Sequence, residues 1–88
     1  MLGNTLKSIR IMSGEKQTDM AKKIGVSQMT LSRIENGIAI MKDDTFRKII
    51  DNYDLEDYLR ERFTMEFASQ SKEISEKNEL FEIENKKN

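Results

Sequence analysis

Residues 17–37 read QTDMAKKIGVSQMTLSRIENG, and this stretch decides the fold. Its apolar residues recur at helical spacing, which is typical of amphipathic helices. Gly25 can end the first helix because glycine adopts a positive φ without steric cost, and Ser27 is suited to cap the second helix. The stretch therefore predicts two short helices joined by a tight turn, the second with a polar outer face.

The whole chain has 88 residues, which allows one compact domain with an appended tail. It contains no cysteine and no histidine, so it lacks the usual zinc ligands and the commonest catalytic nucleophile and base. We therefore expect no metal, no cofactor and no enzymatic activity. The N-terminal residues resemble neither a signal peptide nor a membrane span, which predicts a soluble, cytoplasmic protein.

The charge of the chain is divided unevenly between its two halves. Residues 1–50 carry nine Lys and Arg against five Asp and Glu, a net charge of +4. Residues 51–88 carry six basic residues against eleven acidic ones, a net charge of −5. Because affinity for DNA depends on a local basic surface, the division suits a DNA-binding N-terminal half, although ordinary surface variation explains it as well.

The periodicity predicts an all-α protein, because no segment alternates with a period of two and the chain has no proline. We expect a domain over residues 1–68 and a charged tail over residues 69–88. A loop over residues 38–41 is expected to separate the third helix from the fourth. The predicted helices cover residues 4–12, 17–24, 27–35, 43–53 and 55–68.

The predicted fifth helix has an apolar face wider than packing on one domain requires. One edge is expected to pack on the domain and the other on a second copy of the chain; the alternative is a helix clamped between its own domain and its own tail. The residues assigned to dimerisation are Leu55, Tyr58, Leu59, Phe63 and Phe67.

The tail is charged and polar, with apolar anchors only at Ile74, Leu80, Phe81 and Ile83. Its pattern does not decide between a disordered segment, a helix and a segment ordered by a partner. A partner protein for this tail is one possibility that the composition leaves open.

On a helical wheel, Leu31 and Ile34 mark the buried face of the third helix. The opposite face holds polar residues and one methionine, which can lie against base edges in the major groove. A solvated polar face is the alternative, and the exposed Met29 favours the groove. The predicted base-reading residues are Gln28, Met29, Ser32 and Arg33.

Contacts to the DNA phosphates need amides and cations beside the groove. Gln17 begins the second helix, where backbone N–H groups are also free. Lysines are candidates by charge, with a solvated role equally open to them. The predicted phosphate-binding residues are Gln17, Ser27, Asn36, Lys16 and Lys42.

Together these features make residues 2–59 resemble the five-helix domain of lambdoid phage repressors, Cro proteins and the XRE family. The matching signs include Leu2-Gly3, Ser13-Gly14, Gln17, Ile24-Gly25-Val26-Ser27 and the run from Leu31 to Gly37. The resemblance implies a homodimer on a pseudo-palindromic operator in double-stranded DNA. It also implies an ion pair between Arg10 and Glu35 that serves structure rather than DNA contact.

Some residues depart from the pattern of that family. Lys16 stands where the family has a small capping residue, and the loop over residues 38–41 is unusually apolar. Asp43 and Asp44 lie near the expected path of a phosphate. These departures leave the fold intact and make weaker or partner-assisted DNA binding plausible.

We therefore predict a sequence-specific transcriptional regulator, a dimeric repressor of the kind found on phages and plasmids. The alternative is an antitoxin-like protein whose acidic C-terminal segment binds a partner protein, with DNA binding used for autoregulation.

Overall fold

The computed structural model of the chain describes residues 1–70. Within them it contains five helices and no strand, which confirms the all-α prediction. None of these helices is long and apolar enough to cross a membrane. The helices are α1 (Leu2–Met12), α2 (Gln17–Ile24), α3 (Gln28–Glu35), α4 (Asp43–Asn52) and a fifth helix over residues 57–70.

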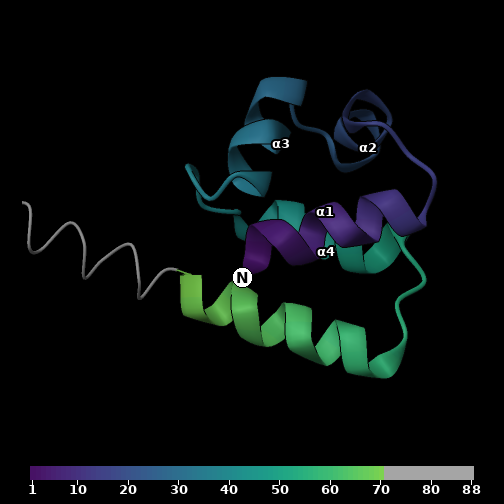
Figure 1. Ribbon diagram of the computed structural model, residues 1–88, viewed down its shortest axis with the longest axis vertical. Coiled ribbons are helices and arrows are strands. Elements are labelled where there is room, and N and C mark those ends of the chain that lie inside the picture. The colour runs from purple at the N-terminus through teal and green to yellow at the C-terminus, as the bar shows by residue number, and fades with distance from the viewer. Residues whose placement is uncertain (71–88) are drawn as a thin grey trace, which may run out of the picture.

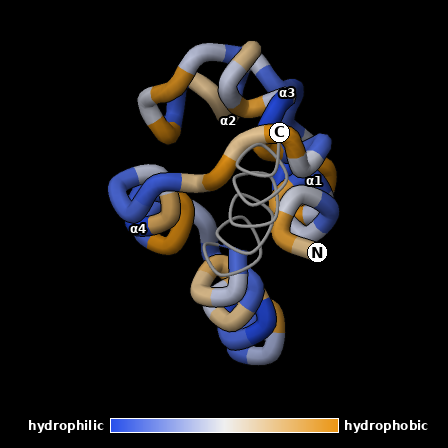
Figure 2. The backbone as a smooth tube through the Cα atoms, turned by 90° about the vertical axis from the view of Figure 1, so that its left-hand side faces the viewer, coloured by the Kyte–Doolittle hydropathy of each residue, from blue (hydrophilic) through white to orange (hydrophobic). Residues whose placement is uncertain are grey.

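The helices are arranged in three tiers. Figures 1 and 2 both show α2 and α3 together at one end, α1 and α4 facing each other in the middle, and the fifth helix beyond them. The side of α3 that packs on the domain contacts α1 and α2. The opposite side of α3 is therefore free to face a ligand at the end of the molecule.

Local signals explain why α2 and α3 form where the sequence predicts. The Asp19 carboxylate accepts a hydrogen bond of 3.0 Å from the Lys16 backbone N–H at the start of α2. Gly25 ends α2 in the left-handed region, at φ 72°. Ser27 then caps α3, because its Oγ accepts a 3.0 Å hydrogen bond from the Thr30 N–H.

The first helix begins two residues earlier than predicted, because Leu2 is already buried in the core. The fourth ends at Asn52, one residue before the expected end, and Tyr53 continues in an extended conformation. Leu6 and Ile9 of α1 and Ile49 of α4 belong to the same buried apolar core as Leu2.

Phe63 of the fifth helix lies in the centre of this core with an exposed fraction of 0 %. Its ring centroid is 5.3 Å from that of Phe46, and the Phe46 and Phe67 rings stack at 4.2 Å. Leu55 is buried as well, and Leu59 is half-buried against the core. Leu55 and Phe63, which we expected on a dimerisation face, are instead core residues of their own domain.

The fifth helix begins at residue 57, two residues after its predicted start at residue 55, and continues to residue 70, the last residue that the structure describes. The side chain of Gln70 is buried: its Oε1 accepts a 2.9 Å hydrogen bond from the Met41 N–H, and its Nε2 donates to the Met41 carbonyl. The packed domain therefore extends at least to residue 70. The predictions for Ile74, Leu80, Phe81 and Ile83 lie outside the described residues.

Gly3 allows the first turn of α1 to approach the end of α3. A Cβ at this position would collide with the Glu35 carbonyl oxygen and would lie 2.7 Å from that of Ile34. Gly3→Ala is therefore expected to lower the free energy of unfolding by roughly 1–3 kcal/mol, because backbone must move to admit the methyl group. Urea denaturation measures the change. Asn4→Ala, at the exposed neighbouring position, is the control, and equal stability of the two variants contradicts the close approach.

Glu66 joins the fifth helix to the start of α1. Its carboxylate lies 2.9 Å from the Met1 ammonium and accepts a hydrogen bond from Thr5 Oγ1. Partial burial acts to raise the pKa of Glu66, but the hydrogen bonds from the Met1 ammonium and Thr5 outweigh it and lower the pKa.

A carboxyl whose pKa is lowered by folding stabilises the fold above its unfolded pKa, and this stabilisation is lost as the pH falls through the folded value. We therefore expect Glu66→Gln to lower the free energy of unfolding by roughly 1 kcal/mol near neutral pH, and by progressively less below about pH 4. Urea denaturation of both proteins across this pH range tests it. A cost that does not change with pH contradicts the ionic contribution.

Candidate nucleic-acid interface

The third helix presents its polar residues to solvent as the wheel predicts. Leu31 and Ile34 are buried, whereas Gln28, Met29 and Arg33 are exposed. Met29 has an exposed fraction of 64 %, although methionine is usually buried. The outer face of α3 therefore carries an amide, a thioether and a guanidinium, the chemical groups that pair with adenine, a thymine methyl and guanine respectively.

Ser32 and Asn36 lie further along the same helix and contact each other. The Asn36 Nδ2 donates a hydrogen bond of 2.8 Å to the Ser32 carbonyl and one of 3.4 Å to the Ser32 Oγ. The Ser32 carbonyl also accepts the Asn36 backbone N–H at 3.0 Å, so the side chain gives this carbonyl a second hydrogen bond. Its side-chain oxygen is not used in these bonds, and Ser32 itself is half-buried.

Ser27 has two hydrogen bonds at the other end of α3. Besides accepting from the Thr30 N–H, its Oγ donates to Thr30 Oγ1 at 2.9 Å. The hydroxyl proton is thus already engaged in capping. A phosphate contact by the Ser27 hydroxyl, as predicted, requires that proton to leave Thr30.

The side-chain amide of Gln17 is hydrogen-bonded to a carboxylate on α3. Its Nε2 donates a hydrogen bond of 3.1 Å to Glu35 Oε1. An amide nitrogen has two protons, so one remains available for another acceptor. Gln17 is also the first residue of α2, where backbone N–H groups have no helical partner. This bond between Gln17 and Glu35 is not visible from sequence spacing, because the two residues are on different helices.

The same carboxylate forms the ion pair with Arg10. Arg10 Nε donates to Glu35 Oε2 at 2.8 Å, and its Nη2 donates to Glu35 Oε1 at 3.1 Å. A third bond runs from Arg10 Nη1 to the Glu15 carbonyl at 3.0 Å. The hydrogen bonds to Glu35 raise the pKa of Arg10 above its usual value against the opposing effect of burial. Arg10 and Glu35 therefore connect α1, α2 and α3 behind the outer face.

The predicted lysines stand before helices. Lys16 precedes α2 and Lys42 precedes α4, and both side chains are exposed. Asp43 and Asp44 occupy the first turn of α4, where the helix dipole favours acids. Within residues 1–70, the side-chain cations in ion pairs are Arg10, Lys23 and Arg62. Lys16 and Lys42 are thus not committed to an acid of their own domain.

Tyr53 joins the end of α4 to the α1–α2 turn, a contact that the sequence reasoning missed. Its hydroxyl donates a 3.1 Å hydrogen bond to Glu15, and the Lys23 ammonium lies 4.9 Å from its ring centroid. Burial raises the pKa of Tyr53, and the hydrogen bond to Glu15 raises it further. The hydroxyl therefore stays protonated and continues to donate.

Comparison with known proteins agrees with this geometry. The sequence model of a family described as helix-turn-helix matches residues 6–57, more than half of the chain. The chain is 39% identical over 54 residues to Antitoxin HipB of Escherichia coli O6:H1 (strain CFT073), covering 61% of this chain and 57% of that protein. Antitoxin HipB of Escherichia coli K12 is also 39% identical over 54 residues, covering 61% of each chain.

The similarity thus spans less than two thirds of the length of these curated relatives. No solved structure matches the chain. The matched residues 6–57 include all of α2, α3 and α4, and with them the outer face of α3. The chain therefore belongs to the XRE-type helix-turn-helix family of DNA-binding regulators.

Proposed function

We propose that the chain is a transcriptional repressor that binds a pseudo-palindromic operator as a homodimer. In each half-site α3 enters the major groove, with Gln28, Met29 and Arg33 against base edges and Ser32 at closer approach. The phosphates are bound beside the groove by Gln17, Asn36, Lys16 and Lys42, together with the exposed backbone at Ser27. A repressor of this type acts by covering a promoter.

The observation that carries this proposal is the two-sided character of α3. One side is buried on α1 and α2, and the other exposes the residues that pair with bases. The Gln17 amide lies beside it, fixed by Glu35. An exposed methionine between two polar side chains gains little in water, but it can bury apolar area against a thymine methyl.

Selection of bound sequences from a random DNA pool at stated salt tests the proposal, because it reports binding, symmetry and half-site spacing together. We expect an inverted repeat with half-site centres about 10 base pairs apart, one turn of the duplex. Affinity is expected to fall steeply with salt, since phosphate contacts release counterions. A pool with no enriched sequence contradicts operator binding.

Arg33 gives a prediction for base reading. Arg33→Ala is expected to weaken operator binding by about 1–3 kcal/mol through one base pair in each half-site. It should weaken binding little when that base pair of the operator has been replaced. Competition binding with every single base-pair variant of the selected operator measures this. Lys42→Ala is the control, because loss of a phosphate contact weakens all sequences alike. An equal loss on all sequences with Arg33→Ala contradicts base reading.

A second candidate function is that of an antitoxin, which binds a partner protein and regulates its own synthesis through DNA. It is favoured because both relatives above are named Antitoxin HipB. The acidic balance of residues 51–88 is a further support. Both candidate functions use the same DNA-binding face and differ in whether the chain also has a protein partner.

Truncation distinguishes the two candidates. The chain must be ended after residue 70 and not earlier, because the Gln70 side chain holds Met41. The antitoxin role is supported if a protein from the cells of origin binds the full chain but not the truncated chain, while the two chains bind the operator equally. If no protein is retained by either, the simple repressor is favoured.

A further inference from the structure

A cleft of about 160 Å³ lies between the end of α1, the loop after α4 and the start of the fifth helix. The buried side chains of Ile9, Tyr53 and Leu55 line it, together with the exposed Met12 and Tyr58. Its volume is below the roughly 300–1,000 Å³ of pockets that enclose small molecules, so it suits a single apolar side chain better. The functions proposed above assign no role to this cleft.

The exposed residues of the cleft are large and apolar. Met12 is 71 % exposed and Tyr58 is 65 % exposed, and Ile11 beside Met12 is exposed as well. Single exposed apolar residues are ordinary, whereas a group of them beside a concave surface indicates an interaction site. Tyrosine is also one of the residues that contribute most to protein interfaces.

Acidic residues surround the cleft. Asp54 and Glu56 line it, and both are exposed, as is Asp57. Residues 51–61 carry five Asp and Glu against one Arg, a net charge of −4. Within residues 1–70 no cation forms an ion pair with any of these five carboxylates. The surface around the cleft is therefore negative.

The stability of the helices explains only part of this charge. Glu56 and Asp57 stand at the start of the fifth helix, where the helix dipole favours acids. Asp51 stands in the last turn of α4, where the dipole disfavours an acid. Asp54 lies between the two helices. The negative charge of Asp51 and Asp54 is therefore available to a partner.

The charge decides which molecule suits the cleft. A negative surface repels DNA phosphates and anionic membranes. A second copy placed about a two-fold axis would bring the five carboxylates against five more. The tail of the chain is unsuited as well, because its apolar residues 80, 81 and 83 lie in the acidic run ELFEIE, residues 79–84. A protein segment with Lys or Arg beside an apolar side chain complements both the cleft and its charge.

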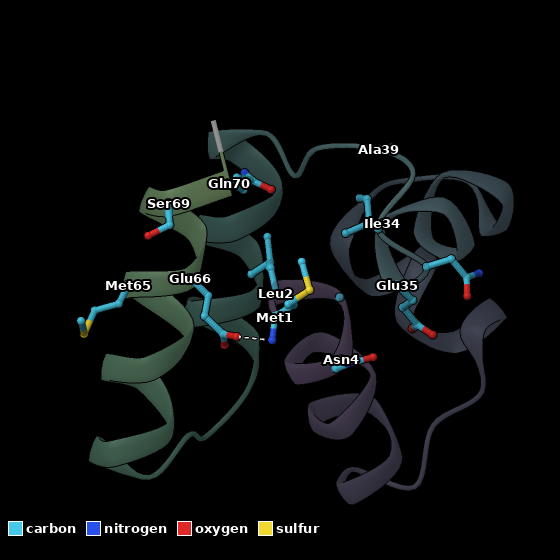
Figure 3. A pocket seen from close by; sticks show the side chains of 13 residues that line it. Met1, Leu2, Asn4, Ile34, Glu35, Ala39, Met65, Glu66, Ser69 and Gln70 are labelled. Atoms are coloured by element: carbon cyan, nitrogen blue, oxygen red, sulfur yellow. Dashed lines mark ion pairs between the residues drawn. The ribbon is translucent and has the colours of Figure 1, made fainter. Parts of the chain in front are cut away.

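The cleft lies away from the candidate DNA interface. Figure 1 shows α3 and the fifth helix at opposite ends of the molecule, and the N-terminus on the side opposite the end of α1. A larger groove of about 600 Å³ lies on the side of the N-terminus and is lined by Met1, Leu2 and Gln70 among others. Figure 3 shows Met65 pointing outward at the rim of that groove. A molecule in the cleft thus leaves the outer face of α3 free.

We propose that this cleft docks a partner protein through a segment in which Lys or Arg residues flank an apolar side chain. The apolar side chain enters between Met12 and Tyr58, and the cations pair with Asp54 and Glu56. The proposal goes beyond both candidate functions, because it places a partner on the domain itself and not on the tail. It holds for a repressor that contacts a neighbouring protein on DNA and for an antitoxin alike.

Selection from a random peptide library on the full chain supplies the probe. We expect the selected peptides to carry Lys or Arg on both sides of a Leu, Ile, Met or Phe. When a selected peptide is added, two-dimensional NMR spectra of the full chain should show shifted backbone amides at the end of α1 and over residues 54–59, and unchanged ones in α3. A library that yields no peptide, or only acidic or purely polar peptides, overturns the proposal, and so do shifts confined to other surfaces.

Tyr58→Ala and Met65→Ala are matched variants, because the two residues are on the same helix and each is 65 % exposed. We expect Tyr58→Ala to raise the Kd of the selected peptide at least about tenfold, and Met65→Ala to leave it unchanged. Asp54→Lys should also raise the Kd and weaken its dependence on salt, whereas Asp43→Lys, at the start of α4, should do neither. Equal affinities of the two alanine variants, or of the two lysine variants, overturn the proposal.

Sedimentation and operator binding give the last readout. Tyr58→Ala should keep the sedimentation mass and the operator affinity of the parent chain, because the cleft lies away from α3. A loss of either one assigns Tyr58 to a dimer surface and overturns the proposal. The antitoxin candidate is judged separately, by truncation after residue 70, so each of the two can fail without the other.

Discussion

Phe63→Ala should lower the free energy of unfolding by about 3–5 kcal/mol, one of the largest losses expected from a single substitution in this domain. The Phe63 side chain is fully buried and packs against the Phe46 ring, which in turn stacks on Phe67. Truncation leaves a cavity that the rigid helices around it cannot close completely. Because a small domain is stable by only about 5–15 kcal/mol, this loss is a large part of the total.

Urea denaturation measures the change. A shift of the midpoint reports stability alone when the slope of the free energy of unfolding against urea concentration is unchanged. Tyr58→Ala on the exposed side of the same helix is the matched control, and we expect it to stay within about 0.5 kcal/mol of the parent chain. If Phe63→Ala instead lowers the sedimentation mass while the unfolding midpoint is unchanged, Phe63 belongs to a dimer face after all.

Phe63 also shows what the sequence could not decide. Helical periodicity predicts how wide the apolar face of a helix is, but not which surface covers it. The ring that packs on Phe63 is that of Phe46 from α4, which stacks in turn on Phe67. The width of the face predicts a second copy of the chain at one of its edges, although Phe63, which was among the residues expected there, packs on its own domain.

The ends of α2 and α3 are predicted to within one residue because their signals are local. Gly25 ends α2 and Ser27 caps the start of α3, and each effect acts within a few residues of the chain. By contrast, the link between Gln70 and Met41 joins residues 29 positions apart through a side-chain amide and a loop backbone. No periodic pattern encodes such a bond, so the sequence pattern ends the domain at residue 68, although the packed domain extends at least to residue 70.

The candidate DNA-binding site likewise has a part that the sequence predicts and a part that it does not. Periodicity alone predicts that Gln28, Met29 and Arg33 face outward, and the structure places them there. The Gln17 side chain behind them depends on a tertiary contact, because its hydrogen bond to Glu35 forms only when α2 and α3 are packed, whereas the bond from Asn36 to Ser32 joins residues four positions apart at the end of α3. Their roles toward phosphates stay predictions.

Glu35→Leu is expected to have the second large effect, a loss of about 3–5 kcal/mol in the free energy of unfolding. The Glu35 side chain is almost fully buried and accepts hydrogen bonds from Arg10 and Gln17. Its removal leaves the Arg10 guanidinium partly buried, with the Glu15 carbonyl as its remaining partner. Removing one partner of a buried ion pair costs much more than replacing both with apolar residues.

A double-mutant cycle separates this loss of stability from an effect on DNA. Arg10→Met with Glu35→Leu should be more stable than the sum of the two single losses predicts, because no unpaired charge remains. Gln17 still lacks its acceptor in the double variant, so affinity for every DNA sequence should remain low even as stability returns. Urea denaturation and operator binding measured on the same four proteins decide the matter. Full recovery of affinity together with stability indicates that Glu35 serves the fold alone, whereas additive losses of stability contradict a coupled ion pair.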